Sequence, residues 1–521
     1  MPEPAMDYPI DPRPSVLPRY SLPALVELLG GELRTLHESD PQVSGVTLDS
    51  RQVRPGDLYA ALPGATVHGA SFVDAAVAAG AAAVLTDAAG AERITAHLPV
   101  WVVERPRTVL GRVAATVHGR PADRLRSIGV TGTHGKTTTC FMLEAGLVGA
   151  GATAGLVGTV GTRIAGWSVK TTLTTPEAPD LHALFAVMVE RGVEAVAMEV
   201  SSHALVMGRV DGVVFDVAVF TNLGRDHLDF HADIEDYFQA KAQLFTPERA
   251  RRGLVNIDDL FGRRLLEQTA PDGIPMRTFS PSGGDADWRV EDVDARPDGS
   301  DMVIVAPDGS RHPLRLTAPG RFNIANALAA VAALGEAGLD VAGAVAGVSE
   351  VTGIPGRMES IRSGLGFTVV VDYAHKPDAV TAVLSALRPV TSGRLITVIG
   401  AGGDRDRGKR PIMGEIAARL SDVLVVTDDN PRTEDAAAIR SEVIGGIDDV
   451  LPTERAEIVE IGDRRAAIAA ALAQASPGDC VLVAGKGHEP GQEIAGVVHP
   501  FDDRDVVRTV LARMAEEANH R

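Results

Sequence analysis

The stretch Arg126-Ser-Ile-Gly-Val-Thr-Gly-Thr-His-Gly-Lys-Thr-Thr-Thr139 determines how the central part of this chain is expected to fold. It predicts a short apolar strand, then a glycine-rich turn, and then a helix that begins at Lys136. Gly132 and Gly135 allow backbone N–H groups to approach phosphate oxygens closely, and Lys136 supplies a cation for the outer phosphates. The Thr137 hydroxyl is a suitable Mg²⁺ ligand. The stretch therefore predicts nucleoside-triphosphate chemistry.

This loop does not by itself identify an enzyme. Val130 stands where the standard Walker pattern has its first glycine, so the loop is a variant of that pattern. Two classes of protein are open at this point: a phosphate-loop NTPase or kinase with another substrate, and a nucleotide-binding module without catalytic activity.

The composition is that of a large globular protein. A chain of 521 residues with 45% apolar residues and 54 glycines is expected to form roughly three domains. Its net charge of −19 argues against broad binding to nucleic acid or to an anionic membrane, although a local group of basic side chains could still hold a polyanion. Cys140 and Cys480 lie far apart without metal-type spacing, so two buried thiols are expected.

The first residues of the chain, 1–20, are expected to form a flexible tail. They are rich in proline and lack the basic and apolar regions of a signal peptide. No run of apolar residues approaches the roughly 20 that a membrane-spanning helix needs. We therefore expect a cytoplasmic protein without a membrane span, and we expect it to be a monomer.

Apolar segments alternate with predicted helices along the rest of the chain, which predicts an α/β fold of three domains. Residues 21–121 are expected to form a small α/β N-terminal domain. Residues 122–355 are expected to form a central domain with the phosphate loop and a parallel-rich sheet, and residues 356–521 a Rossmann-like, doubly wound domain. Segments near Pro121 and Pro355 are the expected linkers.

Polar side chains follow two predicted strands of the central domain. The apolar run 193–200 contains Glu199 near its end, and the run 213–220 leads to His227. Parallel sheets place ligands at the carboxyl ends of their strands, so both side chains are expected beside the phosphate loop. Carboxylate and neutral imidazole groups are acceptable partners for Mg²⁺, and the carboxylate is the better one. For either residue alone, a salt bridge or a turn explains the pattern equally well.

A second series of strand ends lies in residues 356–521. Charged side chains follow three of its predicted strands, namely Arg405, Arg432, Lys486 and Glu489, with Asp429 beside them. A guanidinium group can hold a carboxylate through two parallel hydrogen bonds, and a carboxylate can hold an ammonium group. The set is typical of a site for a zwitterionic amino acid. Ion pairs at a sheet edge are the structural alternative.

Further motifs follow one another along the chain: LDSR with PGDLYAALPG, TGTHGKTT, AMEVSSHAL, FTNLGRDHLDFH, GRFNIANALAA, GRME, VVVDYAHKPDA, GAGGDRDRGKRP, TDDNPRTE and VAGKGHE. In this order they resemble the Mur ligase family, over essentially everything after the tail. The resemblance implies a three-domain enzyme whose N-terminal domain binds a uridine nucleotide, whose central domain is an ATPase, and whose C-terminal domain binds an amino acid.

The resemblance also implies ligands for individual residues. For ATP it implies Gly132, Thr133, His134, Gly135, Lys136, Thr137, Thr138, Asn323, Arg357 and Asp372. For the UDP-linked substrate it implies Leu48, Ser50, Thr174, Thr175, Ser201 and Arg209. For diaminopimelate it implies Arg405, Asp429, Asn430, Pro431, Arg432, Gly485 and Glu489. Met207 departs from the pattern, since some relatives have a polar substrate contact there.

The catalytic and metal-binding residues are likewise implied by the resemblance. It assigns catalysis to Lys136, Lys241, Glu199 and His227, and two Mg²⁺ ions to Thr137, Glu199, His227 and Lys241. A lone lysine in a helical segment is usually solvated. However, Lys241 matches a lysine that is carbamylated in this family to N6-carboxylysine. Carbamylation turns a cation that repels Mg²⁺ into an anion that can bind it.

The activity that the resemblance implies is ATP-dependent amide formation in cytoplasmic peptidoglycan precursor synthesis. The D-glutamate γ-carboxylate of UDP-N-acetylmuramoyl-L-alanyl-D-glutamate attacks the ATP γ-phosphate, and the amine of meso-2,6-diaminopimelate then displaces phosphate from the acyl phosphate. A lysine-adding relative is an alternative. Folate-polyglutamylating relatives share the ATPase core, but the LDSR segment favours a UDP-sugar substrate.

Overall fold

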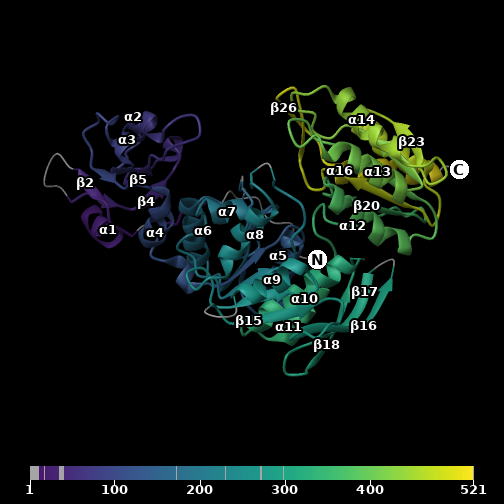
Figure 1. Cartoon of the computed structure of the whole chain (residues 1–521), viewed down its shortest axis with the longest axis horizontal. Coiled ribbons are helices and arrows are strands. Elements are labelled where there is room, and N and C mark those ends of the chain that lie inside the picture. The colour runs from purple at the N-terminus through teal and green to yellow at the C-terminus, as the bar shows by residue number, and fades with distance from the viewer. Residues whose placement is uncertain are drawn as a thin grey trace. The chain divides into compact units, whose positions relative to one another are not determined.

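The computed structural model describes residues 11–16, 18–34, 40–169, 171, 173–228, 230–269, 273–296, 299–318 and 320–519 (Figure 1). The chain divides into two compact units. Unit 1 contains Met1–Leu223, Phe230–Phe279 and Ala329–Gly347, and unit 2 contains Gly224–Asp229, Ser280–Leu328 and Val348–Arg521. The part of the expected flexible tail in residues 1–10 lies outside the described residues.

The N-terminal part of unit 1 is built on a five-stranded sheet in the order β2-β7-β6-β5-β4. Four of its strands are parallel neighbours, and β2 runs antiparallel to β7 at the edge. Apolar cores lie on both faces of the sheet, since Leu58 and Tyr59, adjacent in β5, belong to different buried clusters. The strands are β2 (Glu32–Arg34), β4 (Gly45–Thr47), β5 (Asp57–Ala60), β6 (Ala83–Thr86) and β7 (Val100–Val102), with a separate antiparallel pair β1 (Tyr20–Ser21) and β3 (Gln42–Val43). The helices are α1 (Leu22–Leu29), α2 (Val73–Ala78), α3 (Ala88–Ala91) and α4 (Arg107–Val117).

The strands of the central sheet that belong to unit 1 follow the order β11-β10-β9-β12-β8-β13-β14-β15. The neighbours β9, β12, β8, β13, β14 and β15 are parallel to one another. Strand β10 pairs antiparallel with β9 and with β11. Because β8 lies between β12 and β13, the ends of these three strands meet at one edge. The strands are β8 (Arg126–Thr131), β9 (Ala154–Gly158), β10 (Gly161–Ile164), β11 (Trp167–Val169), β12 (Ala195–Glu199), β13 (Val217–Phe220), β14 (Gly253–Asn256) and β15 (Met276–Ser280). The helices are α5 (Lys136–Gly149), α6 (Ala178–Glu190), α7 (Ser202–Val206), α8 (Ile234–Ala242), α9 (Leu260–Thr269) and α11 (Val341–Ser349).

Local sequence explains the central strands and helices. The residues of β8 after Arg126 are buried, as expected for a parallel strand covered on both faces. Gly129 in this strand leaves room for the Phe215 ring, which would lie 3.0 Å from a Cβ atom at that position. Helix α5 begins at Lys136, which confirms the prediction, and Asp233 caps α8 by accepting a hydrogen bond from Asp236 N at 2.8 Å.

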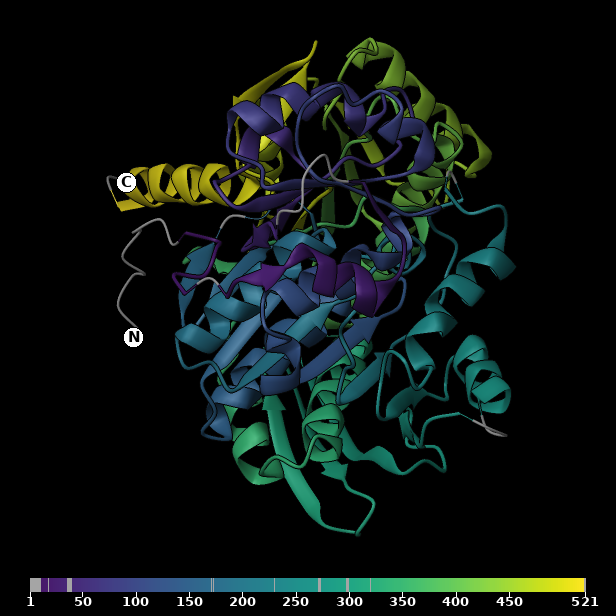
Figure 2. The same ribbon diagram turned by 90° about the vertical axis from the view of Figure 1, so that its left-hand side faces the viewer.

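Unit 2 contains an antiparallel ribbon and a doubly wound sheet. The ribbon, teal to green at the bottom of Figure 2, consists of β16 (Trp288–Arg296), β17 (Gly299–Val305) and β18 (Arg311–Leu316). The sheet has the order β19-β20-β24-β21-β22-β23, and all neighbours except β19 and β20 are parallel. Its strands are β19 (Glu359–Arg362), β20 (Thr368–Asp372), β21 (Leu395–Ile399), β22 (Val423–Val426), β23 (Glu457–Glu460) and β24 (Cys480–Ala484), followed by the hairpin β25 (Gly491–Ile494) and β26 (Val497–Pro500).

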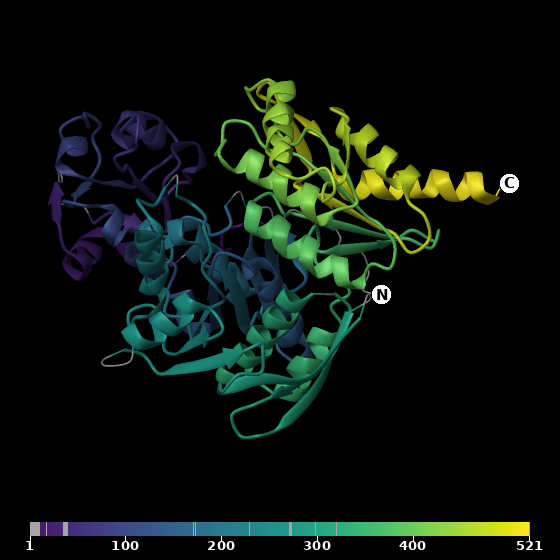
Figure 3. The same cartoon turned by 45° about the vertical axis from the view of Figure 1, so that its right-hand side comes forward.

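Helices cover both faces of this second sheet. Side chains of α12, α13 and α14 share one buried cluster with one face of the sheet, and side chains of α15 and α16 share another with the opposite face. Figure 3 shows the yellow helix α16 apart from the green helices of the first group. The predicted Rossmann-like architecture is therefore confirmed. The helices are α10 (Arg321–Glu336), along which the chain passes from unit 2 to unit 1, α12 (Pro377–Leu387), α13 (Lys409–Leu420), α14 (Ala436–Gly445), α15 (Arg464–Gln474) and α16 (Asp503–Asn519).

The structure bears on the two cysteines and on the expected absence of a membrane-spanning helix. Cys140 and Cys480 are both buried free thiols, and burial raises the pKa of each. Within the described ranges, no helix has the length and apolarity that crossing a membrane requires.

His118 makes unit 1 sensitive to acid. It follows α4 and is 6% exposed, and neither of its ring nitrogens has a hydrogen-bond partner among the described residues. Burial, together with the nearby charges of His182 and Arg13, lowers the pKa of His118 to about 3. The folded state therefore holds this ring neutral at pH values where the unfolded chain protonates it.

We expect His118→Leu to leave the thermal midpoint at pH 7 unchanged or to raise it, because leucine needs no hydrogen-bond partner. In the unmodified protein, stability is lost as pH falls below 6.5, by about 1.4 kcal/mol per pH unit from this group. Thermal unfolding at pH 7 and pH 5 should show a smaller loss for His118→Leu. The exposed His97→Leu serves as control, and an equal acid loss in both variants would contradict the assignment.

Candidate functional site

The turn after β8 has the geometry of a phosphate-binding loop. Gly132 has a φ of 148°, and a Cβ atom there would lie 1.9 Å from the Thr221 hydroxyl. Gly135 is left-handed, with a φ of 87°, immediately before α5 begins. Asn222 supports the loop, since its backbone and side-chain oxygens accept hydrogen bonds from Thr133 N and His134 N, each at 2.9 Å. The loop therefore leads into the N-terminus of a helix, where anions bind favourably.

Two ammonium groups converge on this loop. Lys136 Nζ donates to the carbonyl oxygens of Gly132 and Thr133 at 2.8 and 3.0 Å. Lys241 Nζ, which comes from α8, donates to the same Gly132 oxygen at 2.9 Å. Lys241 is 1% exposed, and its Nζ lies 4.4 Å from the centre of the Tyr237 ring. The structure therefore gives the predicted helical lysine a buried position beside the loop, and it concentrates positive charge where a polyphosphate would bind.

Glu199 stands at the end of β12, opposite Val130 of β8. It is 1% exposed, and its carboxylate accepts hydrogen bonds from the Thr137 hydroxyl at 3.0 Å, the Thr159 hydroxyl at 3.1 Å and Thr159 N at 2.7 Å. Among the described residues, its hydrogen-bond partners are thus two hydroxyls and an amide. A threonine hydroxyl beside a carboxylate is the oxygen donor set that Mg²⁺ prefers, so the residues present fit this ion.

Side chains of the segment before α6 lie next to Glu199. Thr175 Oγ1 donates to the Glu199 carbonyl oxygen at 2.8 Å and accepts a hydrogen bond from Ser201 N at 3.2 Å. The hydroxyl groups of Thr174 and Thr159 are 3.2 Å apart. Three of the residues implied for the UDP-linked substrate therefore form one polar cluster with Glu199 in unit 1.

Arg209 joins this cluster through a shared carboxylate. Its Nη1 donates to the Thr175 carbonyl oxygen at 3.3 Å and its Nε donates to Glu177 at 2.9 Å. Arg107 of α4 donates to the other oxygen of Glu177 at 3.0 Å. Met207 is the departure from the family pattern, and its sulfur accepts a hydrogen bond from Arg209 Nη2 at 3.5 Å. Glu177 therefore holds two guanidinium groups beside the polar cluster.

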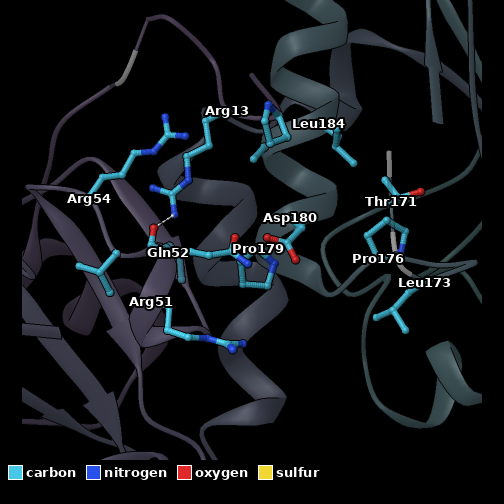
Figure 4. A pocket seen from close by; sticks show the side chains of 14 residues that line it. Arg13, Arg51, Gln52, Arg54, Thr171, Leu173, Pro176, Pro179, Asp180 and Leu184 are labelled. Atoms are coloured by element: carbon cyan, nitrogen blue, oxygen red, sulfur yellow. Dashed lines mark hydrogen bonds between the residues drawn. The ribbon is translucent and has the colours of Figure 1, made fainter. Parts of the chain in front are cut away.

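A cavity of about 460 Å³ lies in unit 1 between the N-terminal sheet and α6 (Figure 4). On one side it is lined by residues that directly follow Ser50, and on the other by neighbours of Thr174 and Thr175. Three arginines and one aspartate contribute its charged groups. The lining residues are Pro12, Arg13, Val46, Arg51, Gln52, Val53, Arg54, Thr171, Leu173, Pro176, Pro179, Asp180, Ala183 and Leu184. Leu48 and Ser50 are neighbours in sequence of the lining residues Val46 and Arg51, but they do not line the cavity themselves.

In unit 2, polar side chains gather after β22 and β24. Asn430 donates to Glu489 at 2.9 Å and accepts a hydrogen bond from Lys486 Nζ at 2.8 Å. Lys486 is fully buried, and its Nζ also lies 3.1 Å from Glu489 and 3.7 Å from Asp429. At Gly485, which has a φ of 123°, a Cβ atom would come within 2.8 Å of the Asp429 carboxylate. The cluster combines one ammonium group with two carboxylates and an amide.

Arg432 lies at the same sheet edge, in a left-handed conformation with a φ of 52°. Its Nη1 donates to the Gly403 carbonyl oxygen at 2.6 Å, and its Nε lies 3.3 Å from a carboxylate oxygen of Glu493. The preceding Pro431 restricts the turn that positions it. Arg405 is exposed, and no hydrogen bond joins it to this cluster in the described part of the chain. The structure thus brings together every predicted member of the amino-acid site except Arg405.

The remaining predicted ATP residues belong to unit 2. Asp372 ends β20 and accepts hydrogen bonds from Met358 N and Ala374 N, each at 2.7 Å, and burial raises its pKa despite the nearby Arg357 charge. The Arg357 guanidinium lies 4.5 Å from the centre of the Tyr373 ring. Asn323 is buried in α10. His227 lies 3.3 Å from Asp226, and Lys376 pairs with that same carboxylate.

The predicted metal ligands are divided between the two units. Thr137, Glu199 and Lys241 lie in unit 1, and His227 lies in unit 2. No three His, Cys, Asp or Glu side chains converge on a possible metal position among the described residues. Of the ligands predicted for Mg²⁺ in unit 1, Glu199 supplies a carboxylate. The further oxygen ligands would have to come from the Thr137 hydroxyl and from an anionic group on Lys241.

Several residues of the site escaped the sequence analysis. Thr159 directly follows β9 and Asn222 follows β13, so the rule that ligands gather at strand ends could have found both. Arg107 and Glu177 had no such signal, because they meet only when α4 packs beside the segment before α6. Their sequence positions are 70 residues apart.

The chain is similar in sequence and in fold to known proteins. Three family models match the chain: the Mur ligase family catalytic domain over residues 42–118, the Mur ligase middle domain over 130–334, and the Mur ligase glutamate ligase domain over 356–487. A solved structure of a UDP-N-acetylmuramoyl-L-alanyl-D-glutamate–2,6-diaminopimelate ligase is similar, with a TM-score of 0.69 and 33% identity, covering 95% of this chain and 99% of that one.

Two curated relatives are similar over nearly the whole chain. The UDP-N-acetylmuramoyl-L-alanyl-D-glutamate–2,6-diaminopimelate ligase of Streptomyces avermitilis is 55% identical, over 97% of this chain and 99% of its own. The UDP-N-acetylmuramyl-tripeptide synthetase of Leifsonia xyli subsp. xyli is 44% identical, over 94% of this chain and 95% of its own. The name of the second relative does not specify its amino acid.

We expect Lys136→Met to weaken the binding of Mg²⁺–ATP about tenfold to a thousandfold, because methionine preserves the length of the side chain and removes the charge that is expected to contact the phosphates. Isothermal titration calorimetry measures the loss, and circular dichroism checks that the fold is intact. Thr137→Ser retains the hydroxyl and should bind within about threefold of the unmodified protein. An unchanged dissociation constant for Lys136→Met would show that the loop is not the phosphate site.

Proposed function

Because the chain belongs to the Mur ligase family, we propose that it is the ligase that adds meso-2,6-diaminopimelate to UDP-N-acetylmuramoyl-L-alanyl-D-glutamate. The observation that carries this proposal is the 55% identity, over nearly the full length of both chains, to a relative with that printed activity. The site adds physical support. Lys136 and Lys241 both donate a hydrogen bond to the Gly132 carbonyl oxygen of its phosphate loop. A separate cluster of ammonium, amide and carboxylate groups suits an amino acid.

The reaction forms an amide at the expense of ATP. The γ-carboxylate of D-glutamate attacks the γ-phosphorus of ATP and ADP leaves, which gives an acyl phosphate. The amine of diaminopimelate then attacks the acyl carbon, phosphate leaves, and a proton is lost from the nitrogen. In this scheme the loop Gly132–Thr138 binds the ATP phosphates, and Lys136 neutralises charge on the transferring group.

Thr137 and Glu199 would hold Mg²⁺ in unit 1, because their oxygens lie 3.0 Å apart beside the phosphate loop. Bound Mg²⁺ would offset the negative charge of the phosphates and of the attacking carboxylate. Thr159 orients the Glu199 carboxylate through two hydrogen bonds. We assign His227 to a second Mg²⁺ ion by its match to the family motif.

Lys241 is proposed to carry a carbamate. Its neutral amine would combine with CO₂ to give N6-carboxylysine and release one proton. The carbamate nitrogen keeps one N–H, which can still donate to the Gly132 carbonyl oxygen as Lys241 Nζ does at 2.9 Å. The new carboxylate would add an anionic oxygen ligand to the donor set of Thr137 and Glu199.

The UDP-linked substrate is proposed to bind in unit 1. The polar cluster of Thr174, Thr175, Ser201 and Arg209 would contact the sugar-peptide part. Leu48 and Ser50 would contact the uridine diphosphate. The adjoining 460 Å³ cavity supports this assignment, because Arg51 and Arg54 line it and guanidinium groups can hold an anionic diphosphate.

Diaminopimelate is proposed to bind in unit 2 at Asp429, Asn430, Arg432, Gly485 and Glu489, with Arg405 completing the set. Asn323, Arg357 and Asp372 would contact ATP. We also propose that residues 21–121, 122–355 and 356–521 act as three functional domains, that the protein is a monomer, and that the reaction takes place in the cytoplasm.

A lysine-adding ligase is the second candidate, favoured by the similarity to a tripeptide synthetase whose printed name leaves the amino acid open. Phosphate release distinguishes the candidates. We expect release to require ATP, the UDP-linked dipeptide and diaminopimelate together, with lysine and ornithine far less effective. Release that is independent of the dipeptide and the amino acid would instead indicate a plain phosphate-loop NTPase or kinase.

We expect Arg432→Ala to raise the KM for diaminopimelate about tenfold to a hundredfold and to narrow the preference over lysine, because diaminopimelate differs from lysine by a carboxylate that a guanidinium can hold. The KM values for ATP and the UDP-linked dipeptide should not change. Arg407→Ala is the matched control, since Arg407 is exposed and pairs with Glu442. Unchanged kinetics for diaminopimelate in Arg432→Ala would remove this residue as the selector.

A further inference from the structure

Residues 11–16, part of the expected flexible tail, make specific contacts with two separate parts of unit 1. Towards the N-terminal sheet, the contacts come from Asp11 and Arg13. Towards α6, they come from Ser15 and Val16. Pro14, between the two sets, is buried. The segment Asp11–Val16, named the strap here, therefore runs from one part of unit 1 to the other.

The Arg13 side chain anchors the first end of the strap. Its Nη1 donates to Asp57 Oδ2 at 2.6 Å and its Nη2 donates to the Gln52 carbonyl oxygen at 2.9 Å. Arg13 and Asp57 are 14% and 3% exposed, so this ion pair is largely shielded from water. Asp57 Oδ2 also accepts a hydrogen bond from Arg54 N at 2.8 Å, and Arg54 pairs with Asp11 at 2.9 Å. The strap thereby holds the turn 51–54, which follows Ser50.

Backbone groups anchor the second end. Ser15 N and Val16 N donate to the two carboxylate oxygens of Glu190 at 3.0 and 2.8 Å, and the Ser15 hydroxyl adds a third contact at 3.2 Å. Glu190 is the last residue of α6, where a negative charge is unfavourable because the helix dipole is negative at that end. The three donors of the strap compensate that charge.

Between its two ends the strap forms part of the cavity wall. Pro12 and Arg13 line the cavity together with Arg51, Arg54 and Asp180. Figure 4 shows Arg13 at the cavity beside Gln52 and Arg54, with Asp180 and Pro179 of α6 across from it. The strap is thus in contact with the elements on both sides of the opening.

We propose that Arg13 is a positioning residue for the UDP-linked substrate and that the strap fixes the turn 51–54 against α6 around the cavity. The inference rests on the proposed function for the identity of that substrate. Arg13 acts through Asp57 and Gln52, which hold the turn after Ser50. Its effect should therefore appear in the use of the UDP-linked dipeptide and not in the use of ATP.

Hydrogen exchange tests the strap without reference to catalysis. In the full-length protein, the amides of Ser15 and Val16 should exchange at least about tenfold more slowly than in an unstructured chain, because both are hydrogen-bonded to Glu190. Glu190→Ala should abolish this protection. Glu194→Ala, which removes a carboxylate that contacts Thr153 N instead, should leave it intact. If both amides of the unmodified protein exchange as fast as in an unstructured chain, residues 11–16 are not bound to Glu190 and the inference is wrong.

Steady-state kinetics tests the positioning role. Arg13→Ala should raise the KM for the UDP-linked dipeptide about fivefold to fiftyfold, with kcat and the KM for ATP within about twofold of normal. Arg13→Lys should recover only part of the loss, since one ammonium group replaces the two-nitrogen contact. Arg34→Ala, at an exposed ion pair on β2, is the control and should change nothing.

The outcomes separate this inference from the proposed function. An unchanged KM for the dipeptide in Arg13→Ala, or an equal rise in the KM for ATP, would overturn the positioning role. If Ser15 and Val16 are protected but the protein shows no ligation with diaminopimelate, the proposed function fails and the strap stands. If ligation proceeds and the amides exchange freely, the strap fails and the proposed function stands.

Discussion

The carbonyl oxygen of Gly132 is the point on which the unit 1 site depends, because it accepts hydrogen bonds from both Lys136 and Lys241 at 2.8 and 2.9 Å. One lysine belongs to the helix that follows the loop, and the other comes from α8. Bringing two ammonium groups this close is costly unless an anion or a fixed dipole compensates them. The carbonyl supplies part of that compensation, and the proposed carbamylation of Lys241 would remove one of the two positive charges.

The parallel sheet extends the same constraint to the carboxylate side of the site. Because β12 pairs with β8 in register, Glu199 lies opposite Val130 at the edge where the loop begins. Its carboxylate then meets the Thr137 hydroxyl, which is 62 residues away in sequence. The lysine-bearing loop and a carboxylate thus lie at the same edge of the sheet, an arrangement that suits a magnesium–nucleotide complex. In unit 2 the same rule gathers Asn430, Lys486 and Glu489 at the ends of two strands.

Sequence reasoning performed well where a local pattern has one structural meaning. The start of α5 at Lys136, the parallel strands around β8 and the doubly wound sheet of unit 2 were all predicted, because glycine spacing and buried apolar runs leave few other folds. Sequence reasoning was less accurate for the ends of strands. The apolar run 213–220 forms a strand only from Val217, because Val213 and Phe215 are buried in the apolar core ahead of that strand. The assignment of Arg405 to the amino-acid site stays a prediction, since that side chain is exposed in the structure.

The contacts of Arg13 could not be predicted from the sequence, whereas other features of the protein could. The sequence by itself determined the α/β class, the phosphate loop, the order of the family motifs and the strand ends at which polar groups gather, because these follow from local residue types and their spacing. Only the tertiary structure decided that Lys241 is buried beside the loop, that Glu177 joins Arg107 to Arg209, and that residues 11–16 contact Asp57 and Glu190. Those contacts join residues far apart in the chain, and their geometry is set by how helices and sheets pack, which no local pattern encodes.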